Sequence, residues 1–347
     1  MIAPRTQRLD ACPLCKSTIA RKAFILPDWH HGVPGEFSYD RCGDCGTVYQ
    51  NPQVIAEDLP RCYPSDYYTH AASTAAAPGE HAPSETRRRL RDAIVRARRG
   101  EAQSTLDAVL GRLLGASRSM RERAFYGLLD ELIPRCPEGG RALEIGCGAG
   151  YLLALLHRNG WRAEGVEWDA AAAAAARERT GLPVRVGDYA RLELPQREYD
   201  LVVLQHVFEH LPDPSNALRR LGGLVRPEGR IVLIFPNPRG LGARLFGRHW
   251  FPWDPPRHLV IAPSRAVARA GARTQLSLVS CRTVTTKWEG YHFALSRAFR
   301  QGRGFRDARQ SVYDKLATRV SAALAPLGLG EEIVIVFEPA GCSTQKG

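Results

Sequence analysis

The chain has 347 residues, of which 44% are hydrophobic and 24% are charged. This composition is typical of a folded globular protein and excludes a collagen-like repeat, a disordered chain and a disulfide-stapled miniprotein. The net charge of +12 allows nucleic acid, an anionic membrane surface or phosphorylated substrates as partners. Because arginine and alanine dominate the sequence, a GC-rich genome explains the charge equally well, and the charge alone decides nothing.

Membrane and export signals are not evident in the sequence. No apolar run approaches the roughly 18 residues of a membrane span, and the first eight residues lack the apolar core of a signal peptide. We therefore expect a cytoplasmic protein with reduced thiols. Composition breaks predict a zinc-ribbon domain at residues 1–70, a linker with a basic helical segment at 71–122, and an α/β domain at 123–347.

Two Cys-x-x-Cys pairs stand near the N-terminus, Cys12 with Cys15 and Cys42 with Cys45. Two intervening residues let a tight turn present both sulfurs to one ion, and four soft ligands suit tetrahedral zinc. A redox role is the weaker alternative, because neither pair stands at a strand-to-helix junction. The pattern predicts a structural zinc ion. The histidine pair 30–31, between the cysteine pairs, is a surface or substrate-side pair or, as the weaker alternative, a source of a ligand.

The next segment changes from small and polar to basic. Residues 71–79 are mostly Ala, Ser, Thr, Pro and Gly, as in a linker. Arg87–Arg99 places Leu90 and Ile94 at helical spacing and predicts an arginine-faced helix. Three interpretations of that helix are open. Its arginines form a solvated face, they contact an anionic lipid or a lipid-linked phosphorylated glycan, or they contact RNA. Further helices are predicted over 106–114 and 125–133.

From there, short apolar runs alternate with helical segments. Alternation of this kind predicts a doubly wound α/β fold, a parallel sheet with helices on both faces. A mostly helical insertion at about 288–329 precedes the last strand. The seven predicted strands are 142–145, 163–167, 184–186, 201–204, 230–235, 276–284 and 333–337, and the helices between them are 151–159, 170–180, 215–225 and 263–270.

A glycine loop follows the first of these strands. Ala142–Ile145 runs directly into Gly146, Gly148 and Gly150, and a helix begins after them. Glycines let a ligand approach the backbone, and the helix N-terminus offers free amides. A nicotinamide dehydrogenase is the alternative, but its Gly-x-Gly-x-x-Gly spacing would need a glycine where Tyr151 stands.

The chain resembles the class I S-adenosylmethionine-dependent methyltransferases, whose Rossmann-like sheet has seven strands. The resemblance covers about residues 141–235. It rests on motifs that occur in the family's order, namely 143–150 (the glycine loop), 165–169 (a strand ending in an acid), 186–189, 199–211 and 224–234.

The resemblance implies a set of contacts to S-adenosylmethionine. Glu144, Gly146 and Gly148 would hold its methionine part, and Glu167 would bind its ribose hydroxyls. The remaining implied contacts, to adenine and to the other side of the cofactor, are Trp168, Asp188, Tyr189 and Gln205.

Methyl transfer to a hydroxyl or an acidic carbon requires removal of a proton, and histidine suits that role near neutral pH. His206, after the fourth strand, is the first candidate, while Glu209 and His210 in the next turn serve either catalysis or the loop. The Pro- and Trp-rich stretch 248–259 follows the strand edge where acceptors bind in this fold, so Arg257 or His258 could reach inward. We hypothesise that His206 and His258 face the acceptor.

Two acceptor classes fit a zinc ribbon joined to this domain. The chain resembles methyltransferases of bacterial sugar, polysaccharide and natural-product pathways, which predicts a sugar, glycan or other small molecule, free or linked to a nucleotide or lipid. The alternative is ribosomal-RNA or tRNA base methylation, which the net charge would suit. The ribbon carries Asp40, Asp44, Glu57 and Asp58, however, and Gln205–Phe208 replaces the Asn/Asp-Pro-Pro-Tyr/Phe motif of many base-methylating enzymes. A binding module without turnover is a third possibility.

Overall fold

The computed structural model describes residues 2–63, 93–94, 97, 104–116, 136–286 and 289–341. Contacts divide the chain into two units, one made of Met1–Ala71 and Cys136–Gly347, the other of Ala72–Arg135. In the second unit, α2 (Thr105–Ala116) confirms the helix predicted at 106–114, and its Gly111 packs against Ala93 and Ala97. Nearly all of Arg87–Arg99, and all of 125–133, lie outside the described residues.

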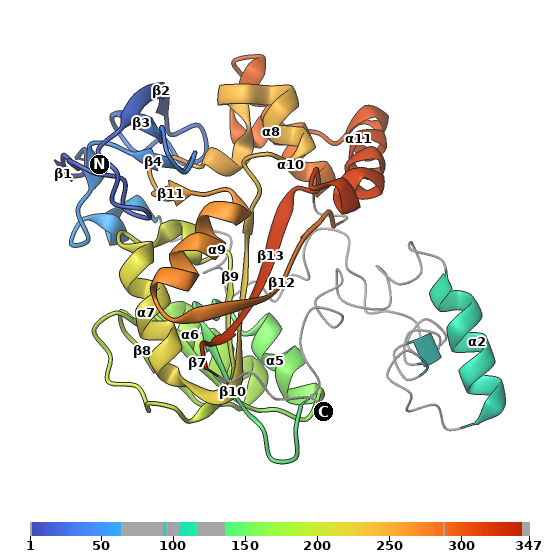
Figure 1. Ribbon diagram of the computed structural model, residues 1–347. Helices are drawn as coiled ribbons and strands as arrows, with labels where there is room; N and C mark the ends of the chain where they lie inside the picture. Colours follow the sequence, from blue (N-terminus) through green and yellow to red (C-terminus); the bar gives the residue numbers. More distant parts are fainter. Residues whose placement is uncertain are drawn as a thin grey trace. The chain divides into compact units, whose positions relative to one another are not determined.

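The main sheet confirms all seven predicted strands. Its order is β12-β13-β10-β9-β6-β7-β8, so the chain begins in the middle and winds outward in both directions (Figure 1). The strands are β6 (Arg141–Ile145), β7 (Arg162–Glu167), β8 (Val184–Val186), β9 (Tyr199–Gln205), β10 (Val225–Pro236), β12 (Leu276–Val284) and β13 (Glu332–Pro339).

One strand corrects the expectation of a parallel sheet. β13 pairs antiparallel with both β10 and β12, whereas β6, β7, β8, β9 and β10 pair in parallel. Val284 at the end of β12 pairs with Glu332 at the start of β13. The long helical connection therefore re-enters the sheet at the edge where β12 ends, and β13 runs between its two neighbours in the reverse direction.

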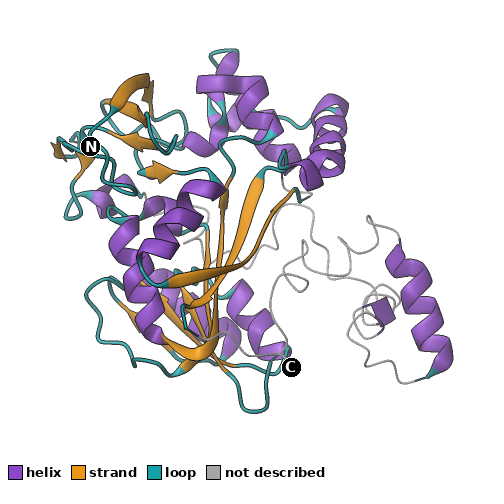
Figure 2. Cartoon of the chain, in the orientation of Figure 1, coloured by secondary structure: helices purple, strands orange, loops and turns teal. Residues whose placement is uncertain are grey.

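Helices cover both faces of this sheet. α5 (Tyr151–Arg158) contacts α6 (Ala170–Thr180), and α7 (Pro214–Leu224) contacts α9 (Ser264–Arg273). The two pairs lie on opposite faces (Figure 2). Side-chain caps begin two of these helices, because Asp169 accepts from the amide of Ala172 and Asp213 from that of Asn216.

A second, four-stranded sheet joins the N-terminal region to the rest of the first unit. Its order is β11-β4-β3-β2, so β11, which comes after the main sheet's β10, completes the sheet of the N-terminal region. In register, Val260 pairs with Tyr49 and Ile261 with Val48. The strands and the short helix of this region are β1 (Thr6–Gln7), β2 (Ala20–Pro27), β3 (Glu36–Cys42), β4 (Val48–Gln50), β5 (Gln53–Val54), η1 (Leu59–Cys62) and β11 (Val260–Ile261).

The predicted helical insertion is confirmed as two helices, α10 (Glu289–Arg300) and α11 (Val312–Leu324), with η6 (Phe305–Asp307) between them and η7 (Ala325–Leu327) after them. The Pro- and Trp-rich stretch forms short turns rather than regular elements. They are η4 (Gly247–His249) and η5 (Phe251–Trp253), and the short helix α8 (Leu241–Phe246) precedes them. Across the described ranges, no helix has the length and apolar character needed to cross a membrane.

Candidate active site

Four cysteines near the N-terminus form a compact thiol cluster. The sulfurs of Cys12, Cys15, Cys42 and Cys45 all lie within 4.8 Å of one another. Each pair closes a tight turn, in which the amide of Lys16 donates to the carbonyl of Cys12 and the amide of Gly46 to that of Cys42. Lys16 and Gly46 adopt φ values of +63° and +78°, as such turns require. The four thiols fit a zinc ribbon.

The glycine loop follows β6 at the carboxyl edge of the main sheet. Gly146 has a φ of +70°, and a Cβ there would lie 2.4 Å from Cγ2 of Val207, in the turn after β9. The amide of Gly148 donates to Oε2 of Glu167 (2.8 Å), and the amide of Asp169 donates to Oε1 of the same carboxylate (3.1 Å). The ends of three neighbouring strands are therefore held in close contact.

Two buried carboxylates lie under this loop. Glu144 and Glu167 are each 3% exposed, and Oε2 of Glu144 has no hydrogen-bond partner among the described residues. Burial, with the charge of Glu167 adding to it, raises the pKa of Glu144 well above its usual range. A buried carboxyl oxygen without a partner is costly, so this position fits a ligand that carries a cationic amine, as the methionine part of S-adenosylmethionine does.

The other implied cofactor contacts are placed differently from one another. Trp168 is partly exposed at the same edge, and Asp188 is largely exposed, accepting from the amide of Ala190. Gln205 is half-buried at the end of β9. Tyr189 instead packs in the core, 6% exposed, with its hydroxyl buried. The three outer residues stand at or just after the carboxyl ends of β7, β8 and β9, whereas Tyr189 belongs to the hydrophobic core.

A histidine cluster occupies the neighbouring part of the edge. Glu209 is fully buried, and its Oε1 lies 3.5 Å from Nδ1 of His206 and 3.9 Å from Nε2 of His258. The rings of His210 and His258 meet edge to face at 4.5 Å. Glu209, His210 and His258 have ligand-type atoms within 4.8 Å of one another, so a metal ion could also bind them.

His206 is held by two carboxylates. Its φ is +52°, a left-handed conformation that is strained for a histidine, and its Nε2 lies 3.0 Å from Oε1 of Glu332 on β13. Burial would lower the pKa of His206, but Glu209 and Glu332 outweigh that effect and hold the pKa well above its usual value. The two carboxylates therefore favour the protonated form of the ring.

The other two histidines are oriented through their Nδ1 atoms. Nδ1 of His258 lies 2.6 Å from the carbonyl oxygen of Pro252, and Nδ1 of His210 lies 3.0 Å from that of Arg257. A carbonyl only accepts, so Nδ1 of each ring is the donor in these contacts. Burial and the nearby His258 lower the pKa of His210 to about 4.

Tyr63, at the end of the N-terminal region, reaches this cluster. Its hydroxyl lies 2.7 Å from Nδ1 of His210, and its ring meets that of Trp168 edge to face at 5.1 Å. The sequence marks Tyr63 only as part of an aromatic stretch, because nothing local indicates that a residue 147 positions before His210 contacts it.

Residues 117–281 match the family model of the methyltransferase domain. Ubiquinone biosynthesis O-methyltransferase of Aeromonas salmonicida is 30% identical over 120 residues, which are 32% of this chain and 50% of that protein. An uncharacterized methyltransferase of Mycobacterium bovis is 34% identical over 113 residues, 32% of this chain and 56% of the other. The chain thus spans about half the length of the curated relatives it matches.

The chain contains a class I S-adenosylmethionine-dependent methyltransferase domain. Geranyl diphosphate C-methyltransferase of Streptomyces coelicolor is a solved structure similar to it, with 17% identity, a TM-score of 0.45, and coverage of 70% of this chain and 86% of that one.

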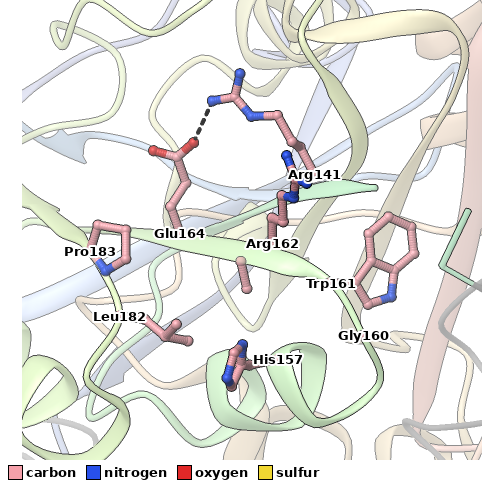
Figure 3. Close-up of a pocket in the computed structure, with 9 residues that line it drawn as sticks. Arg141, His157, Gly160, Trp161, Arg162, Glu164, Leu182 and Pro183 are labelled. Atoms are coloured by element: carbon pink, nitrogen blue, oxygen red, sulfur yellow. Dashed lines mark hydrogen bonds and ion pairs between the residues drawn. The ribbon is translucent and has the colours of Figure 1, made fainter. Parts of the chain in front are cut away.

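A cavity of about 580 Å³ lies at the opposite, amino edge of the methyltransferase sheet. Arg141 and Arg162, at the starts of β6 and β7, line it with Trp161 and His157, and Arg141 points toward Glu164, 3.0 Å away (Figure 3). None of the predicted site residues lines this cavity, so it is separate from the candidate active site.

Proposed function

We propose that the chain transfers a methyl group from S-adenosylmethionine to a hydroxyl or an acidic carbon of a sugar, glycan or other small molecule. S-adenosylmethionine supplies an activated methyl group, so the protein mainly has to orient the acceptor and remove its proton. The observation that carries this proposal is the placement of His258, whose Nδ1 lies 2.6 Å from the carbonyl oxygen of Pro252 and whose Nε2 lies 3.9 Å from the buried carboxylate of Glu209.

His258 is the proposed general base. The carbonyl of Pro252 selects its tautomer, and Glu209 would stabilise the imidazolium that forms when the ring takes up a proton. Burial would raise the pKa of Glu209, yet His206, His258 and His210 together lower it, so the carboxylate is charged when the base acts. His206 already carries a proton, and we assign it to electrostatic support rather than proton abstraction.

On the cofactor side, we propose that Glu144 and the loop amides near Gly146 and Gly148 bind the methionine part, and that Glu167 and Trp168 bind the ribose and the adenine edge. Asp188 and Gln205 complete the site, with Tyr189 supporting it from the core. The four-thiol cluster holds a structural zinc ion in this proposal.

A small acceptor is favoured because the groups around Nε2 of His258 are enclosed. His258 and Glu209 are 8% and 0% exposed, and Tyr63 contacts both His210 and Trp168. A nucleobase within RNA would have to be extruded to reach such a site. RNA methylation therefore remains the second hypothesis, and an RNA control belongs in the assay.

The test begins with calorimetric titration of S-adenosylhomocysteine into the zinc-loaded protein, followed by a screen of nucleotide sugars, glycans and quinol-type acceptors for methyl transfer. We expect His258→Gln to retain product affinity and to lower kcat about 10²- to 10⁴-fold, the usual worth of a general base. His157→Gln, an exposed histidine of α5, is the matched control. Full turnover by His258→Gln would exclude His258 as the base, and failure to bind S-adenosylhomocysteine would remove the proposal altogether.

A further inference from the structure

Arg257 joins the N-terminal region to the loop that carries the acceptor-side histidine. Its side chain is fully buried. The guanidinium binds Asp28 in a two-point fork, with Nη1 2.9 Å from Oδ2 and Nη2 2.7 Å from Oδ1. Nε and Nη2 also donate to Asp254, three residues before Arg257, at 2.9 and 2.7 Å. One side chain therefore ties together two carboxylates that belong to distant parts of the sequence.

The same guanidinium also holds two backbone carbonyls. Nη1 donates to the carbonyl of Cys62 (3.1 Å), the residue before Tyr63, and Nη2 donates to that of Pro255 (3.1 Å), two residues before Arg257. Because guanidinium geometry is planar and fixed, these contacts set the position of both backbone segments together.

Each of the two segments contributes one group that contacts Nδ1 of His210. The carbonyl of Arg257 lies 3.0 Å from Nδ1 of His210, and the hydroxyl of Tyr63 lies 2.7 Å from the same atom. Which nitrogen of His210 carries the proton therefore depends on two groups whose backbone positions the guanidinium of Arg257 determines.

Asp28 is suited to hold this arrangement because its own turn is rigid. Its carboxylate accepts from the amides of His30, His31 and Val33 at 2.9 to 3.1 Å. The position of the carboxylate is thus fixed by the local backbone before it binds Arg257.

We infer that Asp28 is a positioning residue of the acceptor site, which acts through Arg257 to fix the tautomer and ring orientation of His210. The inference rests on the proposed function, in which His258 is the general base, because the ring of His210 meets that of His258 edge to face at 4.5 Å. It gives the zinc-binding region a direct part in methyl transfer, since Asp28 and Tyr63 both come from that region.

The decisive experiment is ¹⁵N spectroscopy of the histidine rings in the full-length, zinc-loaded protein, with resonances assigned through His210→Gln and His258→Gln. We expect the single Nδ1–H tautomer of His210 in the parent protein. In Asp28→Asn that signal should shift toward a mixture of tautomers, while affinity for S-adenosylhomocysteine stays unchanged. Once an acceptor is found, kcat of Asp28→Asn should fall on the order of 100-fold, as expected for a misplaced reacting geometry, with a much smaller change in KM for S-adenosylmethionine.

Asp58→Asn is the matched control. Asp58 is also a buried carboxylate of the N-terminal region, 2% exposed, and it also binds an arginine, Arg5, through two donors. Arg5 is exposed, and its side chain binds Asp58 rather than the histidine cluster, so Asp58→Asn should leave the His210 signal in place.

Two outcomes would overturn the inference. One is a folded Asp28→Asn protein with an unchanged His210 tautomer, and the other is the same shift in Asp58→Asn. Should Asp28→Asn fail to fold, Asp28→Glu keeps the charge but lengthens the side chain by one methylene. An unchanged His210 tautomer in Asp28→Glu would also contradict the inference. Because these readouts need no acceptor, they separate failure of this inference from failure of the proposed methyl transfer.

Discussion

The cofactor side of the candidate site comes from neighbouring parts of the sequence, whereas the acceptor side comes from distant ones. Glu144, the glycine loop and Glu167 lie on two successive strands, β6 and β7, which pair directly. On the acceptor side, Arg257 binds Asp28 across 229 residues, and Tyr63 reaches His210 across 147. The first side can be recognised from local motifs, and the second appears only when the chain has folded.

This contrast predicts that the two sides fail separately. The largest effect is expected from removing one thiol of the cluster, because binding of a structural zinc ion contributes about 10–16 kcal/mol to folding of small zinc domains. In Cys42→Ser we expect loss of stoichiometric zinc and of the His210 tautomer, with S-adenosylhomocysteine still bound, though more weakly. Metal analysis and calorimetry measure both.

The matched control for this change is Cys281→Ser, because Cys281 is an exposed thiol on β12 outside the cluster. It should behave like the parent protein. If Cys42→Ser abolishes product binding as fully as it abolishes zinc binding, the two sides form one inseparable unit and the comparison is wrong.

A second prediction breaks the cofactor side alone. Gly146→Ala combines a φ of +70° with a Cβ 2.4 Å from Val207. Gly181→Ala has a similar φ of +68° but no atom within 4 Å. The strain alone costs about 1–3 kcal/mol, and the contact at Gly146 also displaces the loop. We expect product affinity to fall about 10- to 100-fold in Gly146→Ala and to stay unchanged in Gly181→Ala, as measured by calorimetry.

The third prediction concerns how the ion pair between His206 and Glu332 makes stability depend on pH. The folded pKa of His206 is raised by Glu209 and Glu332, so its contribution to stability is complete below the unfolded value of about 6.5 and is lost as pH rises through the folded value. We therefore expect Glu332→Gln to cost about 1 kcal/mol at mildly acidic pH, a figure reduced for the partial exposure of the ring, and to cost less at alkaline pH.

Urea unfolding across that pH range measures the effect. Glu338→Gln, on the same strand and paired with Arg230, should lower stability without this pH dependence. A cost for Glu332→Gln that grows with rising pH would contradict the assigned charge state of His206.

The smallest effect is expected at an exposed ion pair between the N-terminal region and the methyltransferase domain. Arg191 lies 3.8 Å from Glu57 of the N-terminal region, and their side chains are 74% and 60% exposed. Exposed ion pairs contribute about 0–1 kcal/mol, so Arg191→Ala should leave unfolding and zinc binding nearly unchanged. A large loss of stability would show that surface charge, rather than the buried Asp28–Arg257 pair, links the regions.

The sequence predicts the main fold well because hydrophobic periodicity and turn residues are local signals. All seven strands and the two-helix insertion stand where the patterns place them. The reversed direction of β13 was not predicted, since alternation of strands and helices says nothing about how a long insertion returns to the sheet.

The site divides in the same way. The thiol cluster and the glycine loop can be predicted from residue spacing. In the structure the four thiols lie close together, and the loop is hydrogen-bonded to Glu167. The roles assigned to the cofactor contacts and to His206 and His258 stay predictions. The contacts of Asp28 with Arg257 and of Tyr63 with His210 were not predicted, because their partners lie 229 and 147 positions away. The contact of His206 with Glu332 was not predicted either, because Glu332 lies 126 positions later.

The pairing of β11 with β4 has a consequence for how the protein is made. Val260 and Ile261 pair with Tyr49 and Val48, so the N-terminal sheet lacks its last strand until about 200 further residues have been synthesised. At about 5–20 residues per second, that interval is on the order of 10–40 s. During translation the edge of β4 stays unpaired until that strand emerges, and the proposed zinc ion on the four cysteines would hold the region together locally in that interval.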